Sequence, residues 1–389
     1  MSEVAFGRTV RLVTERATTR GEFRIGLEAV EKATGRLSFD PDVQYEGDGI
    51  RFRSGDVLFG KLRPNLRKAW LADKSGDAVG DFHVYRPVPD RMSSRYLAYL
   101  VLSEPFLEPV IASVYGAKMP RADWGDIRTT KVWVPGLPEQ RAISDYLDRE
   151  TAQIDAFIAK NEELINLLIE RRSAVASQAM YRGFQDVAVR HMVQLIQTGP
   201  FGSQLHAEDY VPGGHPLINP MHMIDGRAVP SSDVAISDDK ADELRRHALR
   251  TDDLVVARRG ELGRSALITP DQIGFLCGTG SMLIRPDSRR VVARYLQLAI
   301  GSERSRSTLR EQSVGSTMEN LNAGALSALR VPLPPIETQH EILHELDVAN
   351  ARIEAALTTA RRSTDLARER RAALISAAVT GKIDAGVAA

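Results

Sequence analysis

The chain has 389 residues, of which 43% are hydrophobic and 26% charged, and its 51 basic residues balance its 51 acidic residues. This composition is that of an ordinary globular protein of two to four domains, and a net charge of zero argues against nucleic-acid binding unless the charges are segregated onto faces. A single cysteine, Cys277, excludes an internal disulfide and a cysteine-rich zinc site. No apolar run approaches the about 18 residues of a membrane span and the N-terminus lacks a signal-peptide core, so we expect a cytoplasmic protein.

Residues 1–137 are expected to form the first globular domain, a mixed α/β unit. Short β-branched and aromatic runs bounded by Gly, Asp and Pro predict its strands, and two apolar stretches are typical of short helices packed against them. The strands are predicted at 57–59, 82–85 and 131–134, and the helices at 95–102 and 105–114.

A long helix is predicted from Gln140 to Met180, a stretch that contains neither glycine nor proline. With Gln140 at position a of a heptad and Ile143 at position d, apolar residues repeat along one face, so the helix requires a partner helix. At 1.5 Å per residue it would be roughly 60 Å long. The residues expected to pair the two helices are Leu147, Ile154, Phe157, Leu164 and Leu168 in this stretch, and Leu346, Ile353, Leu357 and Leu374 in its partner.

The partner helix lies in the same chain, because the second half of the sequence repeats the first. A shift of 199 residues (339 minus 140) places Gln140 on Gln339 and the triplet Glu-Arg-Arg at 170–172 on the same triplet at 369–371. The second long helix is therefore predicted at 339–379. The repeat extends upstream into the globular part, so the chain consists of two tandem units, each a domain followed by a long helix.

The second globular domain, residues 186–336, is expected to repeat the mixed α/β organisation. Its strands are predicted at 254–257, 282–284 and 330–331, its helix at 292–300, and turns or loops at 198–203 and 211–216. Prolines at the end of each domain stop the last strand and fix the angle at which the long helix begins. The predicted division is 1–137 and 186–336 for the globular domains, and 138–185 and 337–389 for the spacer helices.

Catalytic and cofactor motifs are not found in the sequence. Gly-Thr-Gly-Ser at 278–281 lacks the third glycine of a dinucleotide-binding loop and is typical of a strand-edge turn. Asn-Pro-Met-His at 219–222 only partly matches the Asn-Pro-Pro-aromatic motif of amino-methyltransferases. His206, His215 and His222 lack the helical spacing of metal ligands. We therefore expect no catalytic residue, cofactor or metal in this chain.

Basic loops are the remaining candidates for function. Residues 60–68 follow a predicted strand and are rich in Lys and Arg, and 258–264 is the equivalent segment of the second domain. Lys and Arg on such loops can reach phosphates, and Arg can form two hydrogen bonds with guanine. Polar loops at 116–118 and 315–320 also recur. The candidate DNA-binding residues are Lys61, Arg63, Asn65, Arg67, Lys68, Lys118, Arg121, Ser203, Gln204, Arg258, Arg259, Arg264, Thr317, Asn320 and Asn322.

Over essentially its whole length, the chain resembles a specificity subunit of a Type I restriction–modification enzyme. The resemblance is carried by the proline–glutamine runs at 137–140 and 333–339, each of which leads into a long helix, and by the motifs at 55–59 and 198–203. The second run departs from the family pattern, because Thr338 stands where the family usually has Glu.

The resemblance implies two target-recognition domains that each read one half of a split DNA site, separated by two antiparallel helices with pseudo-twofold symmetry. It also implies that these helices set the unread spacer and dock methyltransferase subunits, and the twofold arrangement would fit two copies. Methyl transfer from S-adenosylmethionine and ATP-driven translocation with cleavage would belong to the methyltransferase and restriction subunits. The expected function is that of a non-catalytic DNA-recognition subunit with no membrane contact.

Two alternatives from other classes remain open. A structural adaptor, whose domains bind proteins and whose helices oligomerise, predicts no affinity for DNA at any salt concentration. An enzyme predicts a cofactor pocket in one domain, which S-adenosylmethionine would stabilise thermally. A variant of the leading hypothesis is that the chain recognises DNA for a methylation-only or phage-defence system that has no nuclease partner.

Overall fold

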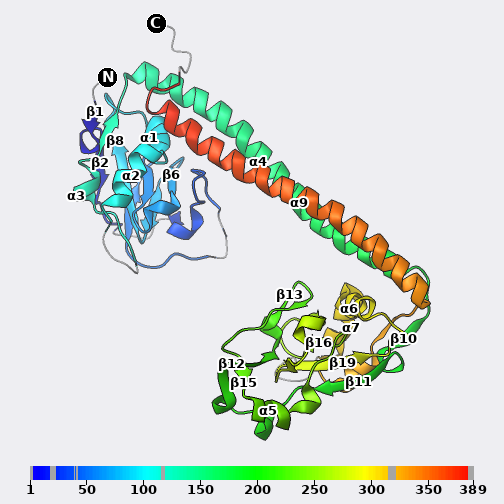
Figure 1. Cartoon of the computed structure of the whole chain (residues 1–389). Helices are drawn as coiled ribbons and strands as arrows, with labels where there is room; N and C mark the ends of the chain where they lie inside the picture. The colour runs from blue at the N-terminus through cyan, green and yellow to red at the C-terminus, as the bar shows by residue number, and fades with distance from the viewer. Residues whose placement is uncertain are drawn as a thin grey trace. The chain divides into compact units, whose positions relative to one another are not determined.

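The chain divides into two compact units, and each contains one globular head and part of both long helices (Figure 1). Unit 1 comprises residues 1–164 and 359–389, and unit 2 comprises residues 165–358. The computed structural model describes residues 3–17, 23–38, 40, 43–114, 119–313 and 321–383. The four-part division expected from the sequence stays a prediction, since the boundary between the compact units falls within both helices.

Head 1, the part of unit 1 that precedes its long helix, is mixed α/β. Its main sheet has the strand order β2-β8-β5-β6, a second sheet has the order β3-β7-β4, and β1 pairs with β9. The predicted strands and short helices all appear. The strands are β1 (Glu3–Ala5), β2 (Val10–Val13), β3 (Arg24–Ile25), β4 (Gly49–Phe52), β5 (Val57–Gly60), β6 (Ala69–Leu71), β7 (Gly76–Val79), β8 (Phe82–Pro87) and β9 (Lys131–Trp133), and the helices are α1 (Ser94–Leu100), α2 (Glu104–Ala112) and α3 (Trp124–Ile127).

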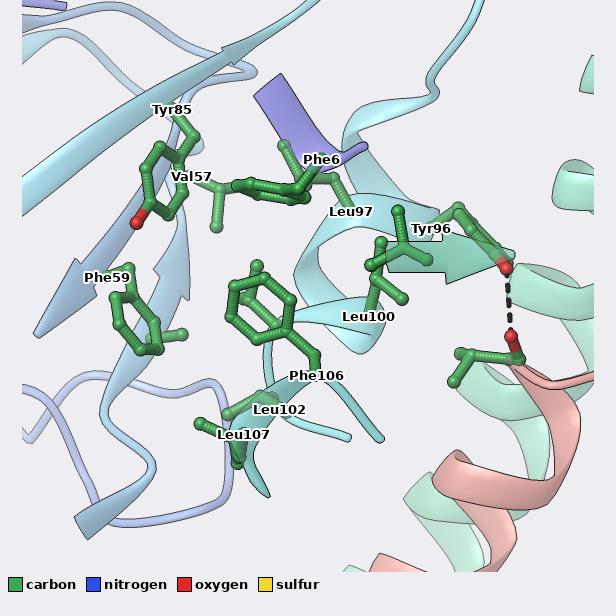
Figure 2. Close-up of a cluster of buried hydrophobic side chains, with 14 of the residues drawn as sticks. Phe6, Val57, Phe59, Tyr85, Tyr96, Leu97, Leu100, Leu102, Phe106 and Leu107 are labelled. Carbon is green, nitrogen blue, oxygen red and sulfur yellow. Dashed lines mark hydrogen bonds between the residues drawn. The ribbon is translucent and has the colours of Figure 1, made fainter. Parts of the chain in front are cut away.

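An aromatic core joins the main sheet of head 1 to its helices (Figure 2). Phe6 lies against Phe106 with 4.8 Å between ring centroids, and Tyr85 stacks on Phe59. Tyr96 of α1 lies at the edge of this core, and its hydroxyl donates to the carbonyl of Val379, 3.2 Å away. The core of head 1 is thus continuous with the C-terminal end of the second long helix.

Head 2 repeats this architecture within unit 2. The order β11-β19-β16-β17 repeats the main sheet of head 1, β10 pairs with β20 as β1 pairs with β9, and β15-β12-β18 form a further sheet. The strands are β10 (Asp186–Ala188), β11 (Val193–Thr198), β12 (Tyr210–Ile218), β13 (Met223–Ile224), β14 (Arg227–Ala228), β15 (Ala235–Ile236), β16 (Leu254–Ala257), β17 (Ser265–Leu267), β18 (Leu276–Cys277), β19 (Ser281–Pro286) and β20 (Arg330–Pro332), and the helices are α5 (Asp238–Glu243), α6 (Ala293–Gly301), α7 (Glu303–Ser313) and α8 (Ala323–Ala328).

One predicted loop of head 2 is wrong, because residues 211–216 lie within β12. Both Tyr210 and His215 pair with Ile236, so the four residues between them bulge out of the ladder. Gly213 takes a positive φ of 78° in this bulge. Proline and glycine are common in turns and in bulges alike, and only the pairing with β15 separates the two.

The long helices are α4 (Leu137–Met180) and α9 (Ile336–Ala378), close to the predicted bounds. They run antiparallel in each unit. In unit 1, Asp155 pairs with Arg371 and Glu162 with Arg368, so the partner number falls as the α4 number rises. In unit 2, Arg172 pairs with Glu354 and Arg182 with Glu345. No helix among the described residues is long and apolar enough to cross a membrane.

The predicted pairing residues of these helices divide into three groups. Leu147 and Ile154 of α4 are buried, as are Leu346, Ile353 and Leu357 of α9. Leu168 and Leu374 are half-buried. Phe157 and Leu164, however, are 49% and 45% exposed and lie outside the buried stripe. Ile143 at position d is buried, but beyond it the second column of the α4 stripe follows position e, where Thr151 is buried and Ile158 and Ile165 are half-buried.

A buried glutamine ties each head to its helix. The side-chain amide of Gln140 donates to the carbonyls of Arg91 (2.7 Å) and Pro135 (2.8 Å), and its oxygen accepts from the N–H of Ser93 (2.8 Å). Gln339 repeats these bonds with Arg290, Pro334 and Val292. Both glutamines are fully buried. The proline–glutamine run is therefore the joint between head and helix in each unit.

Replacing Gln140 with alanine is expected to destabilise unit 1 by about 3 kcal/mol, because two carbonyls and one N–H lose their partner in a buried place. Urea unfolding at pH 7 measures the change. Gln153→Ala, at an exposed position of the same helix, is the control and is expected to shift stability by less than ~0.5 kcal/mol. Equal stability of the two variants would show that the joint does not depend on the buried amide.

Candidate nucleic-acid interface

The basic loop of head 1 connects β5 to β6 and is fixed at its start by backbone bonds to two distant segments. The N–H of Lys61 donates to the carbonyl of Asp81, and the N–H of Ala122 donates to the carbonyl of Lys61, both at 2.9 Å. The N–H of Arg63 donates to the carbonyl of Pro120 at 2.8 Å. These bonds bring the loop beside Arg121, which the sequence predicted as part of the same surface.

Head 2 repeats the same bonds at the loop between β16 and β17. The N–H of Arg258 donates to the carbonyl of Gly280 at 2.9 Å, and the N–H of Leu321 donates to the carbonyl of Arg258 at 2.8 Å. Arg258, Gly280 and Leu321 occupy the positions of Lys61, Asp81 and Ala122. Each head therefore joins its basic loop to the segment that carries Arg121 or Asn322, and the repeat extends to individual backbone bonds.

The side chains of the head 1 loop divide into free and engaged groups. Arg63 and Asn65 are exposed and have no side-chain partner among the described residues. Arg67 forms an ion pair with Glu104, and the amine of Lys68 donates to the carbonyl of Leu27 at 2.7 Å. Burial lowers the pKa of Lys68. Arg67 and Lys68 therefore hold the loop, while Arg63 and Asn65 are available to a ligand.

The conformation of this loop presents Arg63 through an uncommon backbone geometry. Arg63 and Arg67 have φ values of +50° and +53°, in the left-handed region. Residues other than glycine seldom occupy that region, and when they do they concentrate at binding sites. Lys61 and Arg121 flank Asp81, whose carboxylate lies 4.0 Å and 3.0 Å from their nitrogens.

Within the basic stretch of head 2, residues 258–264, Arg259 is the exposed cation that lacks a side-chain partner among the described residues. Arg258 is half-buried and its Nε donates to the carbonyl of Leu321 at 3.1 Å. Burial, followed by the charge of Arg259, lowers the pKa of Arg258. Arg264 is held by Glu261 through bonds of 3.0 Å and 2.6 Å. In the predicted basic stretch of head 2, the guanidinium of Arg259 is therefore free, and that of Arg258 is partly engaged by its bond to Leu321.

The remaining predicted residues have local structural partners or lie outside the described residues. Asn322 caps α8 by accepting from the N–H of Ala325 at 2.8 Å. Gln204 accepts from the N–H of Phe201 at 3.4 Å, and Ser203 is exposed beside it. Lys118, Thr317 and Asn320 lie outside the described residues. As DNA contacts, all of the candidates stay predictions.

The turn at 278–281, predicted as structural, fixes the neighbouring segments of head 2. The N–H of Gly199 donates to the carbonyl of Ser281 at 2.9 Å, and a Cβ at Gly199 would lie 2.0 Å from the carbonyl oxygen of Gly278. A Cβ at Gly278 would in turn lie 2.2 Å from the amide oxygen of Asn219. Gly199 is required because the backbone of Gly278 approaches it, and a Cβ at Gly278 would also lie 2.9 Å from the carbonyl oxygen of Ile218.

Sequence reasoning missed His83, which lies near the head 1 loop. Its ring Nδ1 is 3.2 Å from the hydroxyl of Tyr85. Burial, and then the positive charge of Lys61, lowers the pKa of His83 to about 4. The imidazole is therefore neutral at pH 7 and adds no charge to the loop. The sequence shows only a single histidine within an apolar strand, which does not reveal that the side chain is buried beside the basic loop.

Comparison with known proteins links both the sequence and the fold to one family. Residues 209–360, which cover most of head 2 and the first part of α9, match the Type I restriction modification DNA specificity domain. The chain is 23% identical over 246 residues to the Type I restriction enzyme EcoBI specificity subunit of Escherichia coli, across 57% of this chain and 52% of that protein. It is also 23% identical over 273 residues to the StySPI specificity subunit of Salmonella potsdam, across 66% of this chain and 58% of that protein.

The alignments therefore span little more than half the length of these curated relatives. Two solved structures share the fold over nearly the whole chain. The HsdS subunit from Thermoanaerobacter tengcongensis has a TM-score of 0.55 at 16% identity, covering 98% of this chain and 97% of that one. A chain solved in work on complex assembly of the type I R-M system has a TM-score of 0.72 at 18% identity, covering 98% of both chains. The chain thus resembles Type I restriction enzyme specificity subunits in sequence, most clearly over residues 209–360, and shares its fold with the two solved chains.

Proposed function

We propose that this chain is the DNA sequence-specificity subunit of a Type I restriction–modification complex and that it reads a bipartite duplex site. Each head would read one half-site. The observation that carries the proposal is the duplicated basic loop, which is fixed by the same backbone bonds at Lys61 in head 1 and at Arg258 in head 2. Two similar surfaces on one chain fit a site with two separate halves.

The free cations support direct contact with DNA. An exposed guanidinium can form two hydrogen bonds with guanine in the major groove or one ionic bond with a phosphate. Arg63 in head 1 and Arg259 in head 2 meet this requirement, because neither is neutralised by a carboxylate among the described residues. The neutral net charge is compatible with this role, since most other cations of these loops are already paired within their heads.

The antiparallel helices α4 and α9 are proposed to set the spacer between the half-sites and to dock the methyltransferase subunits. Within unit 1, Phe157 and Leu366 are exposed and line a cavity of about 430 Å³ together with Ile154 and Ala367. Exposed apolar residues on an otherwise charged helix pair are typical of a protein-binding surface. Methyl transfer and DNA translocation would then be performed by other subunits, and the complex would act in the cytoplasm.

Binding of the purified methyltransferase complex to labelled duplexes tests this function. With this chain present, we expect binding that depends on sequence and that weakens steeply between about 50 and 200 mM salt. The same methyltransferase subunits without the chain are the control. Equal binding to every duplex, with and without the chain, would contradict the proposed function and would favour a structural adaptor.

A further inference from the structure

A buried arginine on α9 joins the helix pair of unit 1 to a turn of head 1. The side chains of Arg371 and Asp155 are only 8% and 9% exposed, and the Nε of Arg371 donates to the Asp155 carboxylate at 2.9 Å. The other two nitrogens of the guanidinium donate to the carbonyls of Ala33 (2.7 Å) and Thr34 (2.9 Å). One side chain therefore binds α4 and the head at the same time.

The bound turn is a tight reversal formed by residues 31–36, here called the tip. Its ends are joined by the N–H of Glu31, which donates to the carbonyl of Arg36 at 3.0 Å. Ala33 has a φ of +60°, an unusual value for a residue with a Cβ. Arg36 reaches the same carboxylate as Arg371, since it lies 3.0 Å from Asp155. The tip is shaped so that two successive carbonyls face one guanidinium.

The tip leads directly to the candidate DNA-binding loop. The N–H of Ala33 donates to the carbonyl of Arg67 at 3.0 Å, and Arg67 lies in the loop that presents Arg63. A continuous set of hydrogen bonds thus runs from Asp155 on α4 through Arg371 and Ala33 to the basic loop. The loop has a second link to α9 through Glu104, which pairs with Arg67 and whose N–H donates to the hydroxyl of Ser376 at 3.0 Å. Arg371 is the link that passes through the tip.

A cavity interrupts the packing beside the same contact. A cavity of about 340 Å³ lies beside the tip and is lined by Gly35, Tyr99 and Arg371, among others. Side chains that leave such a space do not by themselves define one position of a turn. The planar guanidinium of Arg371 donates to three acceptors in fixed directions, and these bonds fix the position of the tip.

Unit 2 has the equivalent ion pair but not the equivalent bonds to a head. Arg172 and Glu354 occupy the positions of Arg371 and Asp155 after the shift of 199 residues (371 minus 172). They lie 3.7 Å apart and are 49% and 58% exposed. Among the described residues, Arg172 donates to no carbonyl of head 2. The two arginines therefore form a matched pair in which one binds its head and the other does not.

We propose that Arg371 is a positioning residue that fixes the DNA-reading loop of head 1 on the helix pair, and so defines the spacer length accepted with the first half-site. This inference rests on the proposed function. A lysine at position 371 could still pair with Asp155 but could not serve both carbonyls in the same geometry. Arg371→Lys therefore separates the contact with the head from the ion pair between the helices.

The experiment measures methylation of a plasmid library in which the spacer varies by single base pairs, using complexes that carry Arg371→Lys, Arg371→Met or the control Arg172→Met. We expect both Arg371 variants to retain the bases of the first half-site and to methylate sites with spacers one base pair longer or shorter about tenfold more, relative to the preferred spacer. A tenfold factor corresponds to the loss of one charge-assisted hydrogen bond of about 1.5 kcal/mol. Arg172→Met is expected to behave as the unmodified protein.

Hydrogen exchange on the same complexes reports on the contact without relying on DNA. Faster exchange of the amides at 31–36 and 60–68 in Arg371→Lys, but not in Arg172→Met, is the expected result. Unchanged exchange would overturn the contact, and faster exchange with an unchanged spacer preference would overturn the positioning role. A split site that is absent already with the unmodified chain would instead reject the proposed function and this role with it. If Arg371→Met does not fold, Arg371→Lys alone decides the outcome.

Discussion

Replacing Arg63 with alanine is expected to lower methylation through the first half-site by about tenfold or more, while selection of bases in the second half-site is unchanged. Arg63 is exposed, lies on a loop fixed by backbone bonds, and has no side-chain partner among the described residues. A lost bidentate contact with a base is worth about 1–3 kcal/mol, and 1.4 kcal/mol is a factor of ten. Methylation rates on duplexes with one half-site varied at a time measure the effect.

Arg259→Ala is expected to produce the reciprocal result at the second half-site. Arg258, another of the candidates predicted from the sequence, is a less specific choice, because its Nε donates to the carbonyl of Leu321 and its loss would disturb the loop itself. If the arginine contacts a phosphate and not a base, its loss would weaken binding to all sequences alike and lower the slope of log affinity against log salt concentration by about one. An equal loss at both half-sites in either variant would contradict independent heads.

Matched controls for these variants exist in each head. Arg53 and Arg250 are exposed and precede β5 and β16, whereas the basic loops follow those strands. The backbone N–H of each donates to an aspartate, Asp56 at 2.9 Å and Asp253 at 2.8 Å, so the two positions are equivalent. Arg53→Ala and Arg250→Ala remove the same charge from the other end of the strand. They are expected to leave both half-sites unaffected.

Lengthening both helices by seven residues is expected to abolish methylation at the natural spacer and to shift the preferred spacer by about three base pairs. Seven residues add about 10.5 Å to an α-helix, and successive base pairs are about 3.4 Å apart. Insertions between Leu164 and Ile165 and between Thr358 and Thr359 fall at the boundary between the compact units, so each head keeps its own contacts. Seven residues also preserve the heptad phase of the pair.

The same spacer library measures the result. A four-residue insertion in both helices is the comparison, since it adds about 6 Å but also changes the phase of the stripe. The bases read in each half-site are expected to stay the same in both cases, because no residue of either head is altered. An unchanged spacer preference would show that the helices do not determine the distance between the half-sites.

The long helices and the repeat could be predicted because their signals are local and long. α4 and α9 lie within a few residues of the expected bounds, and the column containing Leu147 and Ile154 is buried as predicted. The other column was ambiguous in the sequence, because Phe157 and Ile158 are both apolar, as are Leu164 and Ile165. Which member of each pair faces α9 is decided by the partner helix. Thr151 is buried in that column because its hydroxyl donates to the carbonyl of Leu147, 2.6 Å away.

The basic loops could be predicted as clusters of cations, but which cations are paired within the head and which are free could not be predicted. Arg67 finds Glu104, and Lys68 finds the carbonyl of Leu27, only after residues far apart in the sequence are brought together. Likewise, the repeated Glu-Arg-Arg triplet was visible in the sequence. The difference between Arg371 and Arg172 depends on whether a turn of the head reaches the helix pair, and the sequence carries no local signal for that contact.

Methylation sequencing of a host genome, with and without this gene beside the proposed methyltransferase partner, tests the central claim most directly. If two heads read DNA separately and the paired helices set their spacing, the modified bases will lie in a motif of two short specific sequences separated by a fixed number of unspecified base pairs, and the motif will disappear when the gene is deleted. A continuous motif, or modification that is unchanged by the deletion, would contradict this account.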